Sequence, residues 1–351
     1  MTATITPHTR STPLRQRGDL GTLRAPPRSA PLRDHHRPDP TPDPTPRTVR
    51  AATRAWGRSS VSPFNIGEGR ELVGQPGLCG TGFVRHGHWA VMATDPATAP
   101  GCEEEGLELT LDLLATRRLR PTFAAVTDPA PYRQRGMWTA TIADDPIIDL
   151  AGFDLAGKRR ANIRHSVTSA RRAGLRVAPW SDELRDQAVG VSDAWLATKR
   201  GGEMGFTLGR FDPDGMRHSD CRVAIDANER VVGFVTWHHY DAGRGRVLDL
   251  MRRLPNAPNP TIDLLIADGL LEFAAGGVEV ASLGCVPCSQ GPLAEKLYPT
   301  ISLHRYKAKF DPRWEQRHLV APSRLELPGA LLALARSYVP GGILRAMRRN
   351  G

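Results

Sequence analysis

The sequence predicts an α/β (α+β) protein that follows an unstructured N-terminal tail. Helical and strand periodicities alternate from about residue 56 onward, and the first 55 residues show neither. The order helix, antiparallel strands, helix, strand occurs roughly twice, which is typical of this fold class. A chain of 351 residues also has room for two ordinary domains. We therefore expect two stacked copies of one fold, with a boundary near Pro179.

The tail differs from the rest in composition. Ten of the thirty prolines fall in residues 1–50, and residues 1–60 carry eleven arginines and four aspartates, which is +7 of the net +10. Such a segment buries too little apolar surface to offset its ordering entropy, so we expect disorder over residues 1–55. The basic arm could contact RNA or anionic lipid, or it could serve solubility alone.

The globular part is predicted element by element from hydrophobic spacing. Helices are expected at residues 105–119, 154–173, 182–198 and 261–275. Strands are expected at residues 122–127, 138–143, 221–225, 231–238, 246–252, 278–283 and 306–310. These elements give a first domain at 56–178 and a second, catalytic domain at 179–326. A basic amphipathic segment at 327–351 suits an anionic membrane surface, or it closes the core and ends in a solvated tail.

Composition also bears on compartment and cofactors. The N-terminus lacks the apolar run of a secretory signal, and no stretch has the apolar length of a membrane span. Five cysteines, an odd number, favour a reducing cytoplasm, with peripheral contact at the inner face of the cell membrane left open. Cys285 and Cys288 form a lone Cys-x-x-Cys pair without the further ligands that zinc needs. We expect no metal and no cofactor.

The most informative charges are Asp249 and Arg252, which interrupt the apolar strand at residues 246–252. Buried charges are costly unless they are paired or functional. Side chains three residues apart on a regular strand face opposite sides, so the two can share one cleft only across a bend or bulge. We interpret them as catalytic residues; the alternative is a structural ion pair.

The loop after this strand, residues 253–259, lies where related architectures bind the pyrophosphate of a coenzyme. It contains no glycine and is rich in proline, which removes backbone donors. Binding of a coenzyme A pyrophosphate is therefore disfavoured. Asp263 follows in the first turn of the next helix, where a carboxylate usually complements the helix dipole.

Three further groups are candidate contacts for a substrate. The glycine-spaced loop at 199–212 carries Glu203 and Phe206, and such a loop is either a substrate site or a set of flexible turns. Arg160, Arg164 and Arg171 form one stripe of the 154–173 helix, suited to RNA phosphates or simply solvated. Lys307 and Lys309 alternate with aromatic residues at strand period, which suits anion binding or an ordinary strand edge.

Taken in order, several short motifs resemble one family, the aminoacyl-phosphatidylglycerol synthases of the multiple peptide resistance factor type, in their carboxy-terminal catalytic domain. They are Gly157-Lys158 with Arg164, Trp195-Leu196 with Lys199, Glu203-x-Gly205-Phe206-Thr207-Leu208-Gly209-x-Phe211-Asp212, Asp249-Leu250-Met251-Arg252, Thr261-Ile262-Asp263, Leu283-Gly284 with Pro287, and Lys307-x-Lys309-Phe310-x-Pro312-x-Trp314. These motifs run from Gly157 to Trp314, and we expect the resemblance to cover about residues 60–325.

The resemblance implies a tandem pair of GNAT-type acyltransferase domains. It also implies a tRNA-dependent aminoacyltransferase that moves an amino acid from aminoacyl-tRNA to a hydroxyl of phosphatidylglycerol. Asp249 and Arg252 would then lie in the catalytic centre, with Glu203, Phe206, Asp263, Lys307 and Lys309 around the substrates, and with Arg160, Arg164 and Arg171 on the tRNA.

The sequence departs from this family in three respects. We expect no counterpart of the family's membrane-spanning flippase region, Asn259-Pro260 replaces a usual glycine, and Cys285 and Cys288 replace Met and Leu. We therefore expect a soluble, peripherally bound member. A GNAT-type N-acyltransferase that uses acyl-CoA and a non-catalytic RNA- or lipid-binding protein are the alternatives.

Overall fold

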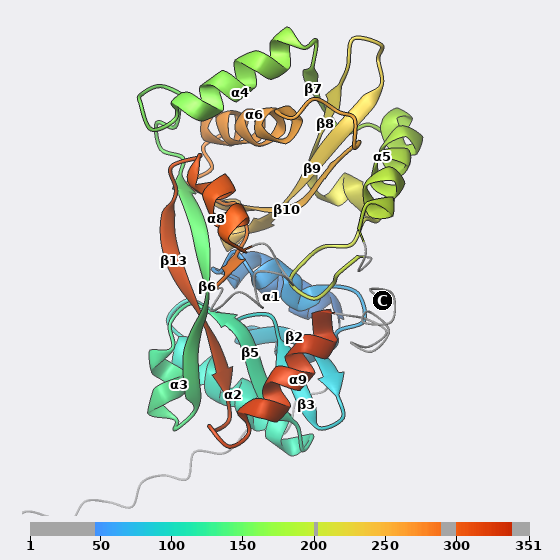
Figure 1. Ribbon diagram of the computed structural model, residues 1–351. Helices are drawn as coiled ribbons and strands as arrows, with labels where there is room; N and C mark the ends of the chain where they lie inside the picture. Colours follow the sequence, from blue (N-terminus) through green and yellow to red (C-terminus); the bar gives the residue numbers. More distant parts are fainter. Residues whose placement is uncertain (1–45, 200–202, 289–299, 339–351) are drawn as a thin grey trace, which may run out of the picture. The chain divides into compact units, whose positions relative to one another are not determined.

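The computed structural model describes residues 46–199, 203–288 and 300–338, which belong to one compact unit spanning residues 41–351 (Figure 1). Its α-helices are α1 Pro46–Trp56, α2 Glu103–Thr116, α3 Ala130–Gln134, α4 Ala161–Arg172, α5 Arg185–Ala197, α6 Thr261–Ala275, α8 Thr300–Ala308 and α9 Leu327–Tyr338. Short 3₁₀ helices are η1 Ser62–Ile66, η2 Asp182–Leu184, η3 Gly215–His218 and η4 Asp241–Gly243. Strands are β1 Glu71–Gln75, β2 Cys79–His86, β3 Trp89–Met92, β4 Ala97–Thr98, β5 Arg120–Val126, β6 Trp138–Asp149, β7 Arg176–Pro179, β8 Asp220–Ile225, β9 Val231–Tyr240, β10 Gly245–Arg253, β11 Val280–Ser282, β12 Val286–Pro287 and β13 Arg313–Ala321.

The strands of the described residues form one mixed sheet in the order β1-β2-β3-β5-β13-β6-β11-β10-β9-β8-β7. We call β1, β2, β3 and β5 the N-terminal half-sheet, and β7 to β11 the C-terminal half-sheet. Pairing is antiparallel except between β3 and β5 and between β10 and β11. The sheet is flanked by helices, which confirms the predicted α/β class. The domain boundary near Pro179 stays a prediction, and α4, which precedes it, packs on α6 beside the C-terminal half-sheet (Figure 1).

Most predicted elements follow from local pattern and are confirmed. α6 has the predicted bounds, because its apolar residues occupy every side of the helix and are buried between α4 and the sheet. β8, β9 and β10 lie within two residues of their predicted positions. The predicted helix at 154–173 is shorter, since residues 154–160 form turns before α4 begins.

The expected disorder of the N-terminal tail is wrong for residues 46–55, and residues 1–45 lie outside the described part. Residues 46–55 belong to α1, which buries Val49, Ala52 and Thr53 against the N-terminal half-sheet. Pro46 is the first residue of this helix, where its missing N–H costs no hydrogen bond. The proline-rich composition of the neighbouring residues hides this short helical stripe.

The predicted strand at 306–310 is also wrong, because residues 300–308 form helix α8. Tyr306 and Phe310 are four residues apart, and their rings pack edge to face with centroids 6.1 Å apart. A five-residue alternation fits this i, i+4 pair as well as it fits a strand. Lys307 lies at the end of α8 and is buried, whereas Lys309 lies in the turn after it, so the two do not share the strand face that was predicted.

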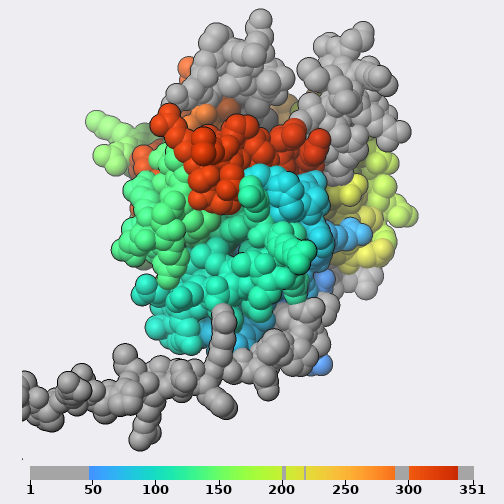
Figure 2. Space-filling view, turned by 90° about the horizontal axis from the view of Figure 1, so that it is seen from below, coloured from blue at the N-terminus to red at the C-terminus, as the bar shows by residue number. Residues whose placement is uncertain are grey.

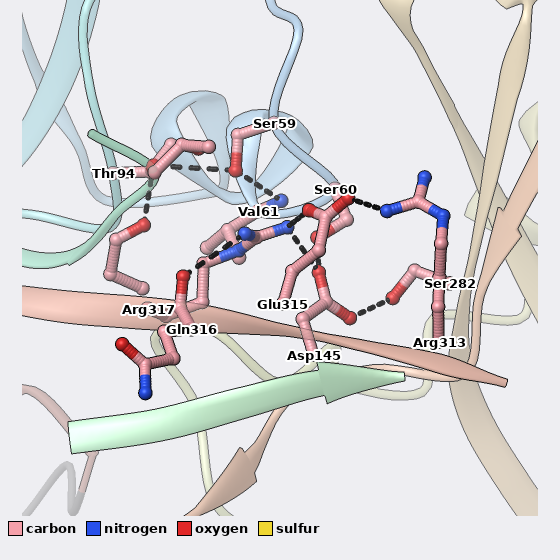
Figure 3. Close-up of polar contacts among 12 residues, drawn as sticks. Ser59, Ser60, Val61, Thr94, Asp145, Ser282, Arg313, Glu315, Gln316 and Arg317 are labelled. Carbon is pink, nitrogen blue, oxygen red and sulfur yellow. Dashed lines mark hydrogen bonds and ion pairs between the residues drawn. The ribbon is translucent and has the colours of Figure 1, made fainter. Parts of the chain in front are cut away.

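A buried polar cluster lies on the antiparallel pair of β6 and β13, between the two half-sheets (Figure 3). The Asp145 carboxylate is fully buried and accepts hydrogen bonds from the hydroxyls of Ser60 and Ser282, each at 2.5 Å. Arg317, also buried, donates to the same carboxylate at 2.7 Å and to Glu315 at 2.9 Å. Four chain segments thus meet at one carboxylate, which we call the Asp145 joint.

Candidate active site

A β-bulge in β10 sets the geometry of the candidate site. Leu248 pairs with Trp237 and Met251 pairs with Val235, so two residues of β10 oppose Thr236 alone on β9. The Leu250 N–H donates to the Thr236 hydroxyl at 3.0 Å, which satisfies a backbone donor that the bulge leaves out of the ladder. Asp249 and Arg252 can share one cleft only if the strand bends between them, and this bulge provides such a bend.

The Asp249 carboxylate is held from two sides. It accepts the Gly209 N–H at 2.6 Å, and its other oxygen lies 3.0 Å from Nε2 of His238. A Cβ atom at position 209 would lie 1.7 Å from that second oxygen, so only glycine fits beside the carboxylate. Only 3% of the Asp249 side chain is exposed. A carboxylate so enclosed is suited to orienting its neighbour.

His238 is the accessible partner of Asp249. Its side chain is 32% exposed, and its ring packs edge-on against Phe64 of η1, with centroids 5.6 Å apart. The pair therefore lies where the C-terminal half-sheet meets the N-terminal half of the unit. From the sequence, the adjacent histidines His238 and His239 could supply a base, but an incidental pair is favoured, because nothing local signals a partner eleven residues away.

Arg252 has a different environment from Asp249. Its side chain is 1% exposed, forms an ion pair with Glu203 and donates to the Ser192 hydroxyl. Its guanidinium also lies over the rings of Trp195 and Phe211, at 4.9 and 5.5 Å from their centroids. In this structure Arg252 and Asp249 form no ion pair with each other, and Arg252 is buried beneath α5. That both side chains face one cleft stays a prediction.

The loop from Glu203 to Phe211 links the two charges instead. Glu203 pairs with Arg252 and accepts the Phe211 N–H at 2.8 Å, while Gly209 donates to Asp249. Through these contacts one short loop connects Glu203 with Asp249, although the two residues lie far apart in sequence. We call residues 203–211 the site loop.

The site loop is anchored on the end of α9. The Gly205 N–H donates to the Tyr338 carbonyl at 3.1 Å, and the hydroxyls of Thr207 and Tyr338 are 2.7 Å apart. Phe206 is buried against the Tyr338 ring and under Arg70, which donates to the Phe206 carbonyl at 2.8 Å. Burial lowers the pKa of Arg70 to about 10. Phe206, expected at the substrate, is thus an anchor of the loop.

Lys307 is enclosed, whereas Lys309 and Asp263 form a pair at the start of α6. Lys307 is 4% exposed and donates to the Gly284 carbonyl at 2.7 Å, and its burial lowers its pKa to about 8. Lys309 lies 3.2 Å from the Asp263 carboxylate and over the Tyr306 ring. Asp263 therefore has a specific cation partner in addition to the helix dipole.

The depressed pKa of Lys307 predicts a pH dependence of stability. Folding disfavours the charged amine, so the contribution of Lys307 to the free energy of unfolding is greatest above the unfolded pKa near 10.5. It falls as the pH drops toward 8, by about 1.4 kcal/mol per pH unit. Denaturant unfolding of the wild type and of Lys307→Met between pH 7.5 and 10 measures this. A stability difference between the two proteins that stays constant over this range would contradict the prediction.

The three arginines expected to bind tRNA are partly engaged within the chain. Arg160 donates to the Asp154 carbonyl at 2.8 Å and lies over the Phe153 ring. Arg164 donates to the carbonyls of Leu155 and Gly157. These hydrogen bonds hold Arg160 and Arg164 against the turns that precede α4. Arg171 is exposed at the C-terminal end of the helix.

The loop before α6 is filled by Arg253, which donates to the Ala257 carbonyl at 2.9 Å. Its guanidinium also reaches the side chain of Asn259. The carbonyl groups of this loop thus accept hydrogen bonds from a cation. A pyrophosphate needs the opposite arrangement, a turn lined by N–H donors. Burial also raises the pKa of the Cys285 thiol, which disfavours its thiolate form.

Within residues 46–199, 203–288 and 300–338, no cluster of three or more metal-ligating side chains occurs. The helices of the same residues are all too short or too polar to cross a membrane.

Residues 81–321 match the family model described as phosphatidylglycerol lysyltransferase, C-terminal. The match covers well over half of the chain, and the chain belongs to this family. The resemblance drawn from the motifs is therefore confirmed, and the family is one of transferases.

Among curated proteins, the chain is similar to the lysylphosphatidylglycerol biosynthesis bifunctional protein LysX. The Mycobacterium marinum protein is 26% identical over 288 residues, which are 73% of this chain and 25% of that protein. The Mycobacterium tuberculosis H37Rv protein is 28% identical over 249 residues, 62% of this chain and 21% of that protein. The chain thus spans about a quarter of the length of these relatives.

Two solved structures share the fold. The C-terminal domain of a putative lysylphosphatidylglycerol synthetase from Agrobacterium fabrum superposes with a TM-score of 0.75 at 21% identity, covering 85% of this chain and 98% of that one. L-PGS from Bacillus licheniformis superposes with a TM-score of 0.71 at 23% identity, covering 84% and 96%.

Proposed function

We propose that this protein transfers an aminoacyl group from aminoacyl-tRNA to a hydroxyl of phosphatidylglycerol. Membership of the lysyltransferase family supports the reaction class. The observation that carries the proposal is the enclosed Asp249 carboxylate beside the accessible His238 at the bulge of β10. A carboxylate that orients a partly exposed imidazole is a recurrent arrangement for taking a proton from a hydroxyl.

In the proposed reaction His238 is the general base. If its Nε2–H donates to Asp249, the other ring nitrogen, Nδ1, carries the lone pair that accepts the proton of the lipid hydroxyl. The lipid oxygen then forms a bond to the aminoacyl carbonyl carbon, and the ester bond to the tRNA ribose breaks. The imidazolium returns its proton to the departing ribose oxygen, so protons and bonds balance.

The other predicted residues take supporting places in this proposal. Arg252 and Glu203 act as positioning residues, because their buried pair fixes the site loop whose Gly209 holds Asp249. Lys307 donates to the Gly284 carbonyl and Lys309 pairs with Asp263, so in this proposal each lysine must exchange its present partner to hold a substrate phosphate. Phe206 anchors the same loop to α9.

The lipid acceptor requires contact with a membrane surface, and α9 offers one. Leu325, Leu331 and Leu332 are exposed, and the last two lie on the face of α9 opposite its buried alanines. Arg324 and Arg336 flank this apolar face, which suits anionic headgroups. α9, in red, forms part of the molecular surface in Figure 2.

Replacing Leu331 and Leu332 together by glutamate is expected to weaken binding to phosphatidylglycerol vesicles about 10- to 100-fold, because apolar area is lost and negative charge is added. Vesicle co-sedimentation measures the effect. Ile301→Glu, which places one glutamate at an exposed apolar residue of α8, serves as the control and should bind as the wild type does. Equal binding by all three proteins would show that α9 does not contact the lipid.

The reaction itself is tested with purified protein, phosphatidylglycerol vesicles and tRNAs charged with radiolabelled lysine, alanine or arginine. The expected product is a labelled, chloroform-soluble lipid whose mass equals that of phosphatidylglycerol plus one aminoacyl residue. Label that stays on the tRNA with every amino acid, or label transfer from an acyl-CoA instead, would overturn the proposal.

A further inference from the structure

A cavity of about 540 Å³ lies between the start of α4 and α8, apart from the Asp249–His238 pair. The side chains that line it include Arg159, Asn162, Ser302, Arg305, Tyr306 and Lys309. Three of them are cations, and none of the described residues that line the cavity carries a carboxylate. The cavity therefore presents positive charge and hydrogen-bond donors to whatever enters it.

The nearby carboxylates leave part of this charge uncompensated. Asp263 pairs with Lys309 at 3.2 Å, and Asp311 lies 3.7 Å from the largely exposed Arg159. Arg305 is exposed and forms no ion pair within the described residues. Lys309 also lies 4.5 Å from the centroid of the Tyr306 ring, which restrains its position at the wall of the cavity.

The adjoining helix adds to the positive potential. α4 has no acidic residue in its first turn and no side-chain cap, and Asn162 of that turn lines the cavity. The helix carries Arg164, Arg171 and Arg172 and contains no aspartate or glutamate. The positive end of the helix dipole and this basic surface both favour an anion.

We propose that this cavity binds a backbone phosphate of the tRNA acceptor end, an inference that rests on the proposed function. A nucleic acid fits better than a lipid headgroup, because it offers successive phosphates and the basic residues continue along α4. The exposed leucines of α9 belong to a helix that packs on β3 and β5 of the N-terminal half-sheet, whereas α4 packs on α6. The two substrates would thus engage different elements of the fold.

The test compares Arg305→Ala and the double variant Arg159→Ala/Arg305→Ala with the wild type. Binding of uncharged tRNA is measured over a range of salt concentrations, and binding of phosphatidylglycerol vesicles is measured in parallel. Arg230→Ala is the matched control, since Arg230 is a similarly exposed arginine on the loop between β8 and β9. All substituted side chains are exposed, so thermal melts should coincide.

We expect each substitution in the cavity to raise the Kd for tRNA about tenfold or less, and to lower the slope of log K against log salt by about 0.7–0.9. Vesicle binding and the control should be unchanged. Loss of vesicle binding with intact tRNA binding would assign the cavity to the lipid phosphate and overturn the proposal, as would no change in either. A wild-type protein that binds no tRNA would instead overturn the proposed function.

Discussion

Asp249→Asn and His238→Gln are each expected to lower the rate of aminoacyl transfer by about 10²- to 10⁴-fold, the range for loss of positioned general-base catalysis. Asparagine keeps the shape of the carboxylate but cannot hold the same imidazole tautomer. Glutamine removes the group that accepts the proton. Because the two side chains act as one unit through their 3.0 Å contact, the double variant should be hardly slower than either single variant.

This result separates the pair from a lone carboxylate base. If Asp249 took the proton by itself, His238→Gln would retain most of the activity, and the effects of the two substitutions would multiply. Single-turnover transfer with pre-bound aminoacyl-tRNA gives the rate of the chemical step. The pH dependence of that rate supplies a second readout, since removal of a base should abolish its rise with pH.

A backbone glycine provides an independent check on the same geometry. Gly209→Ala places a Cβ atom 1.7 Å from the Asp249 carboxylate, so the carboxylate must leave His238 and the rate should fall with little loss of stability. Gly190→Ala is the matched control, because a Cβ atom there meets no neighbour. Full activity in Gly209→Ala would show that the position of Asp249 is unimportant.

The second large effect is expected at the Asp145 joint. Asp145→Ala leaves Arg317 buried without its main counter-ion and leaves the hydroxyls of Ser60 and Ser282 without an acceptor. Breaking a buried ion pair from one side typically costs about 3–5 kcal/mol. The free energy of unfolding should fall by this amount, and the joint between the half-sheets should open first.

Denaturant titration measures this loss, with two comparisons. Asp149→Ala removes an exposed carboxylate from the same strand that pairs with Arg313, and should cost at most about 1 kcal/mol. The double variant Asp145→Leu/Arg317→Met removes both charges and should be more stable than Asp145→Ala. An Asp145→Ala protein as stable as Asp149→Ala would show that the joint does not stabilise the fold.

Local pattern predicts much of this protein, because the relevant forces act over a few residues. The apolar run of α6 and the β-branched and aromatic residues of β8 to β10 leave little choice of structure. The charges at Asp249 and Arg252 mark the place of chemistry for the same reason, since burying them requires partners. The bend that these two residues need in order to share one cleft is present as the bulge in β10.

Local pattern fails where two structures satisfy it equally or where composition hides it. The Tyr306–Phe310 alternation fits a strand and a helical turn alike, and in the fold Tyr306 lies in α8 while Phe310 packs against it from the turn that follows. α1 lies within proline-rich sequence, yet Val49 and Ala52 find a sheet to cover. Neither outcome is available from the neighbouring residues alone.

The sequence by itself determined the α/β class, the family, the order of the elements and the strand that carries the charges. Only the tertiary structure decided that Asp249 turns to His238 and Gly209, that Arg252 turns under α5 to Glu203, and that Arg159, Arg305 and Lys309 surround one cavity. Periodicity reports which face of one element is apolar. It does not report which side chains from distant elements meet, because packing of the whole chain sets those contacts.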